Sequence, residues 1–138
     1  MRMKRIIGIL ALCLFLPGIA ISQEPAKILN KKNLVVKEWN TNAKGAKTLD
    51  HITTYSPDGK KIEEIEYDSL GKQRWRKRFE WGANGRMSKE YLYNEVNRLV
   101  NYKKFEHNEF GKKKIQYTYD PKGRLINTKV YEYIAEDA

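Results

Sequence analysis

Residues 55–98 read YSPDGKKIEEIEYDSLGKQRWRKRFEWGANGRMSKEYLYNEVNR, and one short motif occurs four times in this stretch. Each motif has an aromatic residue, a turn-forming residue, two variable residues, then glycine or asparagine, then lysine or arginine. The spacing continues in both directions at alternating intervals of 14 and 12 residues. The turn residues are Gly45, Gly59, Gly71, Gly85, Asn97, Gly111 and Gly123. A fixed internal period of this kind predicts a repeat architecture built from one small unit.

The residues of the motif predict a particular hairpin turn. Ser, Asp or Asn at the first turn position, with glycine three residues later, is typical of a type I turn. Glycine accepts the positive φ that such a loop needs at its end, and Asn97 fits because asparagine tolerates the same conformation. A type I turn followed by a left-handed residue makes a three-residue hairpin loop with a bulge.

Runs of eight to ten residues between the turns are rich in Tyr, Trp, Ile, Val and Thr and lack Pro and Gly. Such runs indicate strands. The predicted strands cover residues 60–67, 72–81, 86–93, 98–107, 112–119 and 124–133, with a seventh at 47–55 and a weaker eighth at 33–39. The sequence therefore predicts an all-β protein, an antiparallel meander of about seven to eight strands joined by bulged type I hairpins.

The three-residue loop also predicts the direction of the side chains, because it pairs odd with odd positions across each hairpin. One face of the sheet would then hold nearly all the rings, and charged residues would dominate the other. The expected apolar face consists of Ile65, Tyr67, Trp75, Phe79, Trp81, Met87, Tyr91, Tyr93, Leu99, Phe105, Ile115, Tyr117, Tyr119, Leu125, Tyr131 and Tyr133.

A sheet with one apolar face must cover that face. The favoured form is a curved single sheet or half-barrel, and the alternative is a closed β-barrel. The face could also pair with a second copy in a homodimer, or remain open to a ligand. Lysines such as Lys61, Lys77 and Lys103 fall on the same face, where their stems can pack along rings while the ammonium groups reach water.

The first residues indicate export. Residues 1–22 combine Arg2, Lys4 and Arg5 with a short apolar run and a small-residue exit, which is typical of a cleaved, helical signal peptide. The apolar run is shorter than the roughly 20 residues that a membrane span needs, so no span is expected after cleavage. Residues 23–32 are predicted to be a flexible arm, and residues 33–138 the β-hairpin repeat domain.

The single cysteine and the charge limit the chemistry. Cys13 lies inside the leader, so the exported chain would have no thiol for disulfides, catalysis or metal binding. A lipoprotein cysteine would need a small residue before it, and Leu12 is not small. The formal charge of +10 drops to about +7 without the leader, because 24 Lys and Arg remain against 17 Asp and Glu. A basic exported surface favours acidic glycans or lipid headgroups, and nucleic acid is not expected.

The stretch Tyr119-Asp120-Pro121-Lys122-Gly123-Arg124-Leu125 resembles the YD repeat of Rhs-type and wall-associated bacterial proteins. Tyr67-Asp68 with Gly71, and Gly85-Arg86-Met87, match parts of the same pattern. The resemblance covers about residues 55–133, and the spacing here is shorter than in that family. It implies extracytoplasmic β-hairpin arrays that act as shells, scaffolds or carbohydrate-contacting surfaces, and it brings no catalytic residues.

Candidate ligand-binding residues cluster on the predicted strand 72–81. Planar rings suit stacking on sugars, and a row of arginines suits an acidic ligand. The candidate binding residues are Trp75, Phe79, Trp81 and Lys77, with Arg74, Arg76 and Arg78 on the reverse face. Core packing of the rings and simple solvation of the arginines are the alternative explanations.

No residue set indicates catalysis, a metal or a cofactor. His107 occupies the aromatic position of its repeat, and His51 stands alone. Asp58, Asp68 and Asp120 follow the turns and form no carboxylate cluster within one loop. Glu63, Glu64 and Glu66 face the arginine row, so cross-strand ion pairing accounts for them.

The expectation is therefore a non-enzymatic binding or scaffolding module, exported to the periplasm, the outer surface or the medium. The expected partner is an acidic glycan or another envelope component. The alternative is a carrier that holds an apolar ligand or lipid inside a closed meander.

Overall fold

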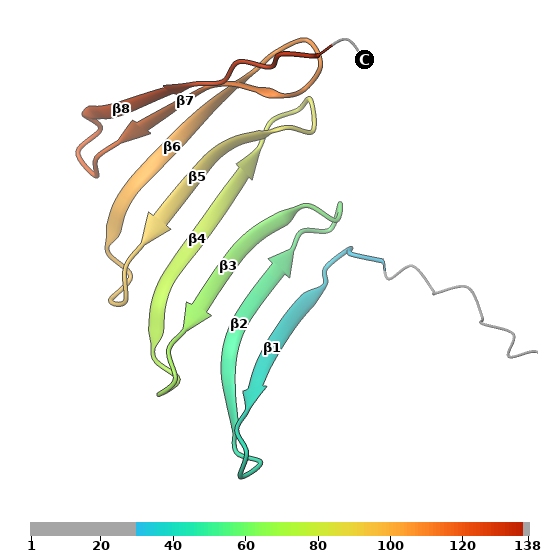
Figure 1. Ribbon diagram of the computed structural model, residues 1–138, viewed down its shortest axis with the longest axis vertical. Helices are drawn as coiled ribbons and strands as arrows, with labels where there is room; N and C mark the ends of the chain where they lie inside the picture. Colours follow the sequence, from blue (N-terminus) through green and yellow to red (C-terminus); the bar gives the residue numbers. More distant parts are fainter. Residues whose placement is uncertain (1–29, 137–138) are drawn as a thin grey trace, which may run out of the picture.

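The computed structural model describes residues 30–136 of the chain. Eight strands form one antiparallel sheet in chain order, so every strand pairs with its neighbours in the sequence (Figure 1). The strands are β1 (Val35–Thr41), β2 (Lys47–Tyr55), β3 (Lys61–Tyr67), β4 (Gln73–Trp81), β5 (Met87–Tyr93), β6 (Leu99–His107), β7 (Lys113–Tyr119) and β8 (Leu125–Val130). The predicted all-β meander is confirmed, with β8 ending three residues before the predicted boundary.

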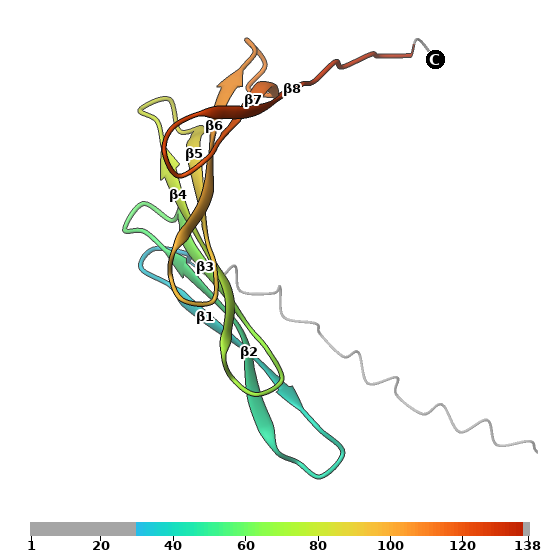
Figure 2. The same cartoon turned by 90° about the vertical axis from the view of Figure 1, so that its left-hand side faces the viewer.

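The sheet is open. The first and last strands, β1 and β8, are its two edges and do not pair with each other. Figure 2 shows a single twisted layer in which no second layer covers either face of the described sheet. The alternative prediction of a closed β-barrel is therefore wrong. The hypothesis of an apolar-ligand carrier assumed the interior of such a barrel.

Two predictions for the N-terminal region fall largely outside the described residues. The predicted signal peptide, residues 1–22, lies there entirely, and so do residues 23–29 of the predicted arm. The rest of the arm contacts the sheet: the Lys31 ammonium lies 5.4 Å from the centre of the Tyr55 ring. Within residues 30–136, no helix is long and apolar enough to cross a membrane.

The seven turn residues Gly45, Gly59, Gly71, Gly85, Asn97, Gly111 and Gly123 all have positive φ. In the loop between β2 and β3, the Gly59 N–H donates to the Ser56 carbonyl, and the Ser56 N–H donates to the Lys60 carbonyl. This is the three-residue loop that the motif predicts. A side chain at the first turn position closes the loop further, as when Asp68 Oδ1 accepts the N–H groups of Leu70 and Lys72.

Every hairpin contains a second irregularity that the sequence did not indicate. Next to the turn, Tyr55 pairs with Lys61, odd with odd as predicted; one step further, Thr54 pairs with Glu63 and Ile62 is left as an extra residue. The extra residue recurs in each hairpin, on the strand that follows the turn. These bulge residues are Asp50, Ile62, Arg74, Ser88, Val100, Lys114 and Ile126. Beyond each bulge, odd positions pair with even positions.

The prediction of one continuous apolar face is consequently wrong, because an extra residue moves the following side chains to the other face. Phe79 pairs with Glu90, so Tyr91 projects from the opposite surface to Phe79 and to Trp81, which lies two residues further on the same strand. We name the two surfaces after their rings. The tyrosine face includes Ile65, Arg76, Arg78, Tyr91, Tyr93, Tyr102, Lys104, Ile115, Tyr117 and Tyr119. The tryptophan face includes His51, Thr53, Lys61, Glu64, Trp75, Lys77, Phe79, Trp81, Glu90, Phe105, Gln116 and Thr118.

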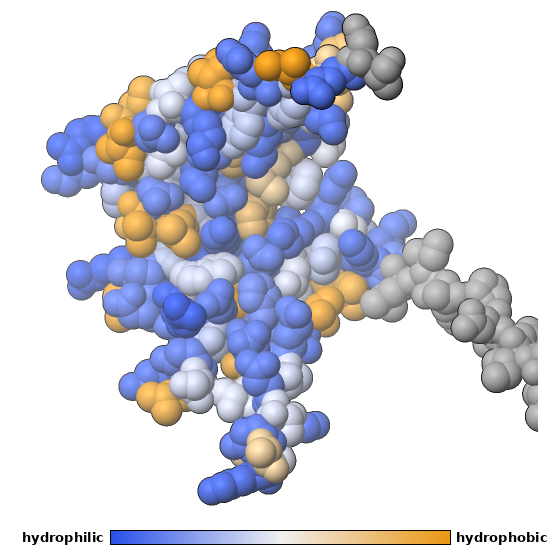
Figure 3. Space-filling view, in the orientation of Figure 1, coloured by the Kyte–Doolittle hydropathy of each residue, from blue (hydrophilic) through white to orange (hydrophobic). Residues whose placement is uncertain are grey.

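On the tryptophan face, the ring-bearing strands β4 and β6 lie next to strands with charged or polar side chains, and this arrangement covers the rings without a second layer. Lysine and arginine stems reach across to the neighbouring ring: Lys61 Nζ lies 4.9 Å from the centre of Phe79, and Lys113 Nζ lies 4.3 Å from that of Phe105. Phe79 and Phe105 are 7% and 9% exposed. Figure 3 shows the result on one surface, where apolar side chains are separated by hydrophilic ones.

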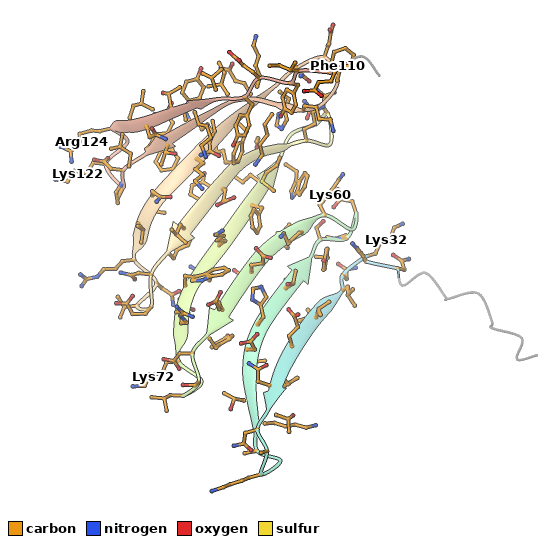
Figure 4. The ribbon with its side chains drawn as sticks, viewed as in Figure 1. Lys32, Lys60, Lys72, Phe110, Lys122 and Arg124 are labelled. Carbon is orange, nitrogen blue, oxygen red and sulfur yellow. The ribbon has the colours of Figure 1, made fainter. Side chains whose placement is uncertain are left out.

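Turns at the same end of the sheet recur every 26 residues and contact one another. Lys60 Nζ donates to the Gly85 carbonyl at 3.3 Å, and Arg86 donates to the Asn108 carbonyl at 3.0 Å. At the opposite end, Gln73 Nε2 donates to the Asn94 carbonyl at 2.8 Å. In Figure 4, Lys32, Lys60 and Phe110 mark one end of the sheet, and Lys72, Lys122 and Arg124 mark the other. The repeating unit of the structure is therefore a pair of strands.

Candidate ligand-binding faces

A row of three tyrosines crosses the middle of the tyrosine face. Tyr91 on β5, Tyr102 on β6 and Tyr119 on β7 are direct cross-strand partners. The ring centres of Tyr91 and Tyr102 are 5.8 Å apart, and those of Tyr102 and Tyr119 are 5.0 Å apart, with stacked planes. The spacing follows the roughly 4.8 Å that separates neighbouring strands, so the sheet itself sets the repeat of the rings.

Arginine extends this row onto β4. Arg78 is the direct partner of Tyr91, so the row runs Arg78, Tyr91, Tyr102, Tyr119 across four strands. Arg78 is exposed, and within the described residues no carboxylate lies within 4 Å of its guanidinium. At the other end of the row, Lys104 Nζ lies 5.3 Å from the centre of Tyr119 and likewise has no carboxylate partner among residues 30–136.

Arg76 lies beside Arg78 on the same face and is more enclosed. Its guanidinium carbon is 4.5 Å from the centre of the Tyr93 ring, and NH1 lies 3.4 Å from a Glu63 carboxylate oxygen. Its Nε is buried and has no hydrogen-bond partner within the described part of the chain. A buried donor without a partner is uncommon in folded proteins, so Arg76 Nε is an unsatisfied polar group beside the tyrosine row.

Two hollows flank Arg78. One, of about 320 Å³, is lined by Thr54, Ile62, Glu63, Arg76 and Arg78 along with Phe79. The other, of about 80 Å³, is lined by Arg78, Phe79, Glu80, Tyr91 and Tyr93. The guanidinium thus stands between two shallow depressions at the head of the tyrosine row.

The tryptophan face holds its rings in closer packing. Trp75 meets the His51 ring edge to face at 5.7 Å between centres, and Lys77 Nζ lies 5.1 Å from the Trp75 ring. The Trp81 indole N–H donates to the Lys61 carbonyl at 2.8 Å, and Lys60 covers this ring at 5.1 Å. The buried residues of the described chain, Phe79, Phe105, Thr53, Gln116 and Thr118, all lie on this face.

Carboxylates pair with three lysines of the tryptophan face. Glu90 lies 3.7 Å from Lys77 and 3.5 Å from Lys103, and Lys61 lies 2.9 Å from Glu64. An anionic ligand would have to compete with these pairs. On the other face, Arg78 lies opposite Glu63 on β3, but no carboxylate of residues 30–136 is within 4 Å of its guanidinium.

The structure therefore divides the predicted site. The tryptophan face holds Trp75, Lys77, Phe79 and Trp81, and neighbouring side chains pack over its three rings. Arg76 and Arg78 share the tyrosine face, as the prediction of a reverse arginine row requires. Arg74 is a bulge residue whose side chain pairs with Glu66 at 2.9 Å, and it lines a separate hollow of about 610 Å³ between the first and third turns.

Tyr102 is the functional candidate that the sequence interpretation missed. An unbroken odd-with-odd register puts the even positions of β6, Tyr102 among them, on the face where charged residues are expected to dominate. Its direct pairing with Tyr91 and Tyr119 is visible only once both bulges are known.

Ionisation on these faces follows from burial and from neighbouring charges. Burial raises the pKa of Tyr91, and the nearby Glu80 carboxylate adds to this effect. Burial also lowers the pKa of His107, with smaller contributions from Arg86 and Lys113. Both groups therefore favour their neutral forms at neutral pH.

The histidines and turn aspartates are placed as packing and turn residues. His51 packs on Trp75 and lies 3.7 Å from Glu64, while Asp68 and Asp120 accept backbone N–H groups within their own turns. Among residues 30–136, no group of three or more His, Cys, Asp or Glu could hold a metal ion.

Comparisons with known proteins add little to this picture. No protein-family model matches the chain, and no curated protein matches it. Among solved structures, the chain is similar to part of a GtfA/B complex whose crystal structure has UDP and GlcNAc bound, with 13% sequence identity and a TM-score of 0.32. The match covers 78% of this chain and only 21% of that chain.

Proposed function

We propose that this chain is an exported bacterial binding module without catalytic activity, and that its tyrosine face contacts an acidic glycan of the cell envelope. The observation that carries the proposal is the row of Arg78, Tyr91, Tyr102 and Tyr119, in which the Arg78 guanidinium has no carboxylate within 4 Å among residues 30–136. The signal-peptide pattern, the basic charge and the resemblance to YD-repeat proteins support the envelope as its place of action.

The direction of the row fits a linear polymer. Four neighbouring strands span about 14 Å at the usual strand separation, so an extended chain crossing the strands could contact all four side chains. Tyrosine offers apolar ring edges together with a phenolic hydroxyl, which suits a ligand that has both C–H and hydroxyl groups. The Arg78 guanidinium would donate a bidentate pair of hydrogen bonds to a carboxylate or sulfate of the polymer.

The tyrosine face is favoured over the tryptophan face because of charge. Lys77 and Lys103 share Glu90, and Lys61 has Glu64, so the cations around Trp75 and Phe79 are already paired. Lys113 and Lys129, further along this face, have no carboxylate within 4 Å in the described chain, but they do not adjoin the tyrosine row. Arg78 and Lys104 have no carboxylate within 4 Å in the described chain, whereas Arg76 pairs with Glu63 at 3.4 Å. The two arginines of this face also belong to the binding residues that the sequence predicted.

The proposal is tested by exchanging neighbouring cations on opposite faces. Arg78→Ser and Lys77→Ser each remove one positive charge from β4, so both variants lose the same non-specific attraction. We expect Arg78→Ser to bind immobilised polygalacturonate about tenfold more weakly than the unmodified protein, because a charge-assisted hydrogen bond is lost. Lys77→Ser should bind nearly as the unmodified protein does. Neutral dextran serves as the control matrix.

Equal weakening by both substitutions would mean that only net charge matters, and the tyrosine face would then not be the site. A second pair adds a check on the rings: Tyr102→Leu should weaken binding, whereas Trp75→Leu should leave it unchanged once folding is verified by circular dichroism. Retention that depends on Trp75 instead would move the site to the tryptophan face.

A further inference from the structure

Most of the exposed large apolar side chains of residues 30–136 lie at the two edges of the sheet; the others are Leu70, Val96 and Phe110 in turns and Val100 on β6. Val35 and Trp39 on β1 are 52% and 54% exposed. At the other edge, the exposed residues are Leu125, Ile126, Val130, Tyr133 and Ile134. Apolar side chains are visible over β8 at the top of Figure 3. An edge strand also carries backbone N–H and C=O groups without a partner, so an apolar edge is a natural place for strand addition.

The repeat makes the two edges complementary. Strands β1, β3, β5 and β7 begin at Val35, Lys61, Met87 and Lys113, each 26 residues after the one before. Strands β2, β4, β6 and β8 begin at Lys47, Gln73, Leu99 and Leu125 with the same interval. A second copy placed with its β1 beside β8 of the first would therefore continue the alternation of the sheet, antiparallel and in phase.

The register inside the sheet specifies which residues would meet. In the β4–β5 pair, Arg78 lies opposite Tyr91 and Glu80 lies opposite Lys89. The positions that correspond to these in the repeat place Val130 opposite Trp39 of the second copy. They also place Glu132 opposite Lys37 of the second copy. The first contact joins two exposed apolar side chains, and the second joins opposite charges.

The chain already contains the ion pair that this register would create. Glu80 and Lys89, which occupy the positions of Glu132 and Lys37, lie 3.7 Å apart across β4 and β5. Residues after β8 also keep to the sheet: the Tyr131 N–H donates to the Lys114 carbonyl, and the Tyr133 hydroxyl donates to the Lys113 carbonyl. The Tyr131 backbone is thus bonded to β7 and the Tyr133 side chain contacts it; pairing with a neighbouring β1 would extend β8 through residues 131–133.

We propose that copies of this chain associate head to tail, with β8 of one copy paired to β1 of the next. The contact joins two different edges, β8 of one copy and β1 of the next, and the sheet does not close. It therefore generates an open assembly with no fixed number of copies. The association is independent of a ligand on the tyrosine face and would align the tyrosine faces of successive copies along one sheet.

The first experiment exchanges the charges of the expected pair in the protein exported with its own leader. Lys37→Glu would place two carboxylates opposite each other, and Glu132→Lys would place two ammonium groups there, so each single variant should associate about tenfold more weakly in sedimentation velocity. The double variant Lys37→Glu with Glu132→Lys restores opposite charges and should recover the association. A protein that stays monomeric at all concentrations, or single variants that associate as the unmodified protein does, would overturn the proposal.

A second experiment tests the register by cross-linking. Trp39→Cys together with Val130→Cys should form an intermolecular disulfide under mild oxidation, identified by peptide mass spectrometry as a link between positions 39 and 130. Trp39→Cys with Lys129→Cys is the matched control, because adjacent residues of a strand point to opposite faces. Equal cross-linking in both variants, or none in the first, would contradict edge pairing in this register.

Discussion

At the scale of single residues, the hairpin turns depend on short polar side chains at their first positions. Asp68 and Asp120 each accept two backbone N–H groups of their own loop, at 2.9 to 3.0 Å. Asn94 and Asn108 make the same two bonds in other turns through an amide oxygen. The same loop is therefore closed by a charged side chain in some repeats and a neutral one in others.

The charged turns should make stability depend on pH. The backbone N–H of Lys72 lowers the pKa of Asp68 from 3.8, and that of Arg124 lowers the pKa of Asp120 in the same way. A carboxylate whose pKa is lower in the folded state stabilises the fold above its unfolded pKa, and this contribution is lost as pH falls through the folded pKa. We expect the urea midpoint to drop as the pH falls below about 4.

The matched variant for this prediction is Asp68→Asn with Asp120→Asn, which copies the turns at Asn94 and Asn108. It should keep the fold and flatten the pH dependence of the urea midpoint. An unchanged pH dependence in this variant would mean that other carboxylates determine the acid stability.

At the scale of single elements, the strands stabilise themselves by placing cationic stems over the rings of their neighbours. Lys113 on β7 covers Phe105 on β6 at 4.3 Å, and Lys61 on β3 covers Phe79 on β4. Without a second layer, these stems take over part of the role that a packed core has in other proteins.

Two adjacent lysines allow a direct test. Lys113→Ala uncovers Phe105 and should lower the free energy of unfolding by about 0.5–1 kcal/mol. Lys112→Ala removes the same charge from an exposed turn position and keeps the N–H that Asn108 accepts, so it should change stability little. The measurement is urea denaturation of both variants at one pH; equal losses would show that charge, not coverage of the ring, matters.

The strands also mark the limit of prediction from sequence. The turn residues and strand ranges were predictable because local chemistry decides them. The positive φ at each turn favours glycine or, at position 97, asparagine, and the ring-rich runs between the turns indicate strands. The second bulge was not predictable, because Asp50, Ile62, Arg74, Ser88, Val100, Lys114 and Ile126 share no residue type. That single extra residue in each hairpin separated Trp81 from Tyr91 and brought Tyr102 into the tyrosine row.

At the scale of the whole molecule, the sheet is a one-dimensional stack of strand pairs. Each strand contacts only its neighbours in the chain, and turns at one end interact every 26 residues. The stability of such arrays is approximately a sum over units and the contacts between adjacent units. A whole unit should therefore be removable.

Deletion of residues 73–98 removes β4, β5 and the turn after each of them. Lys72 is then joined to Leu99, and Leu99 takes the place of Gln73 as the partner of Tyr67. We expect a folded six-stranded sheet with a β-rich circular dichroism spectrum and a lower urea midpoint than that of the full sheet. Deletion of residues 73–86 removes one strand and reverses the alternation of ring-bearing and charged strands, so that variant should be markedly less stable. The reverse order of stability would contradict a two-strand unit.

The most direct test of the account is a nuclear Overhauser experiment on the isotopically labelled protein, because the central claim is that the second bulge sends the rings to both faces. The register predicts contacts between the rings of Tyr91 and Tyr102, between those of Tyr102 and Tyr119, and between His51 and Trp75. A ring contact between Phe79 and Tyr91, with none between Tyr91 and Tyr102, would contradict it.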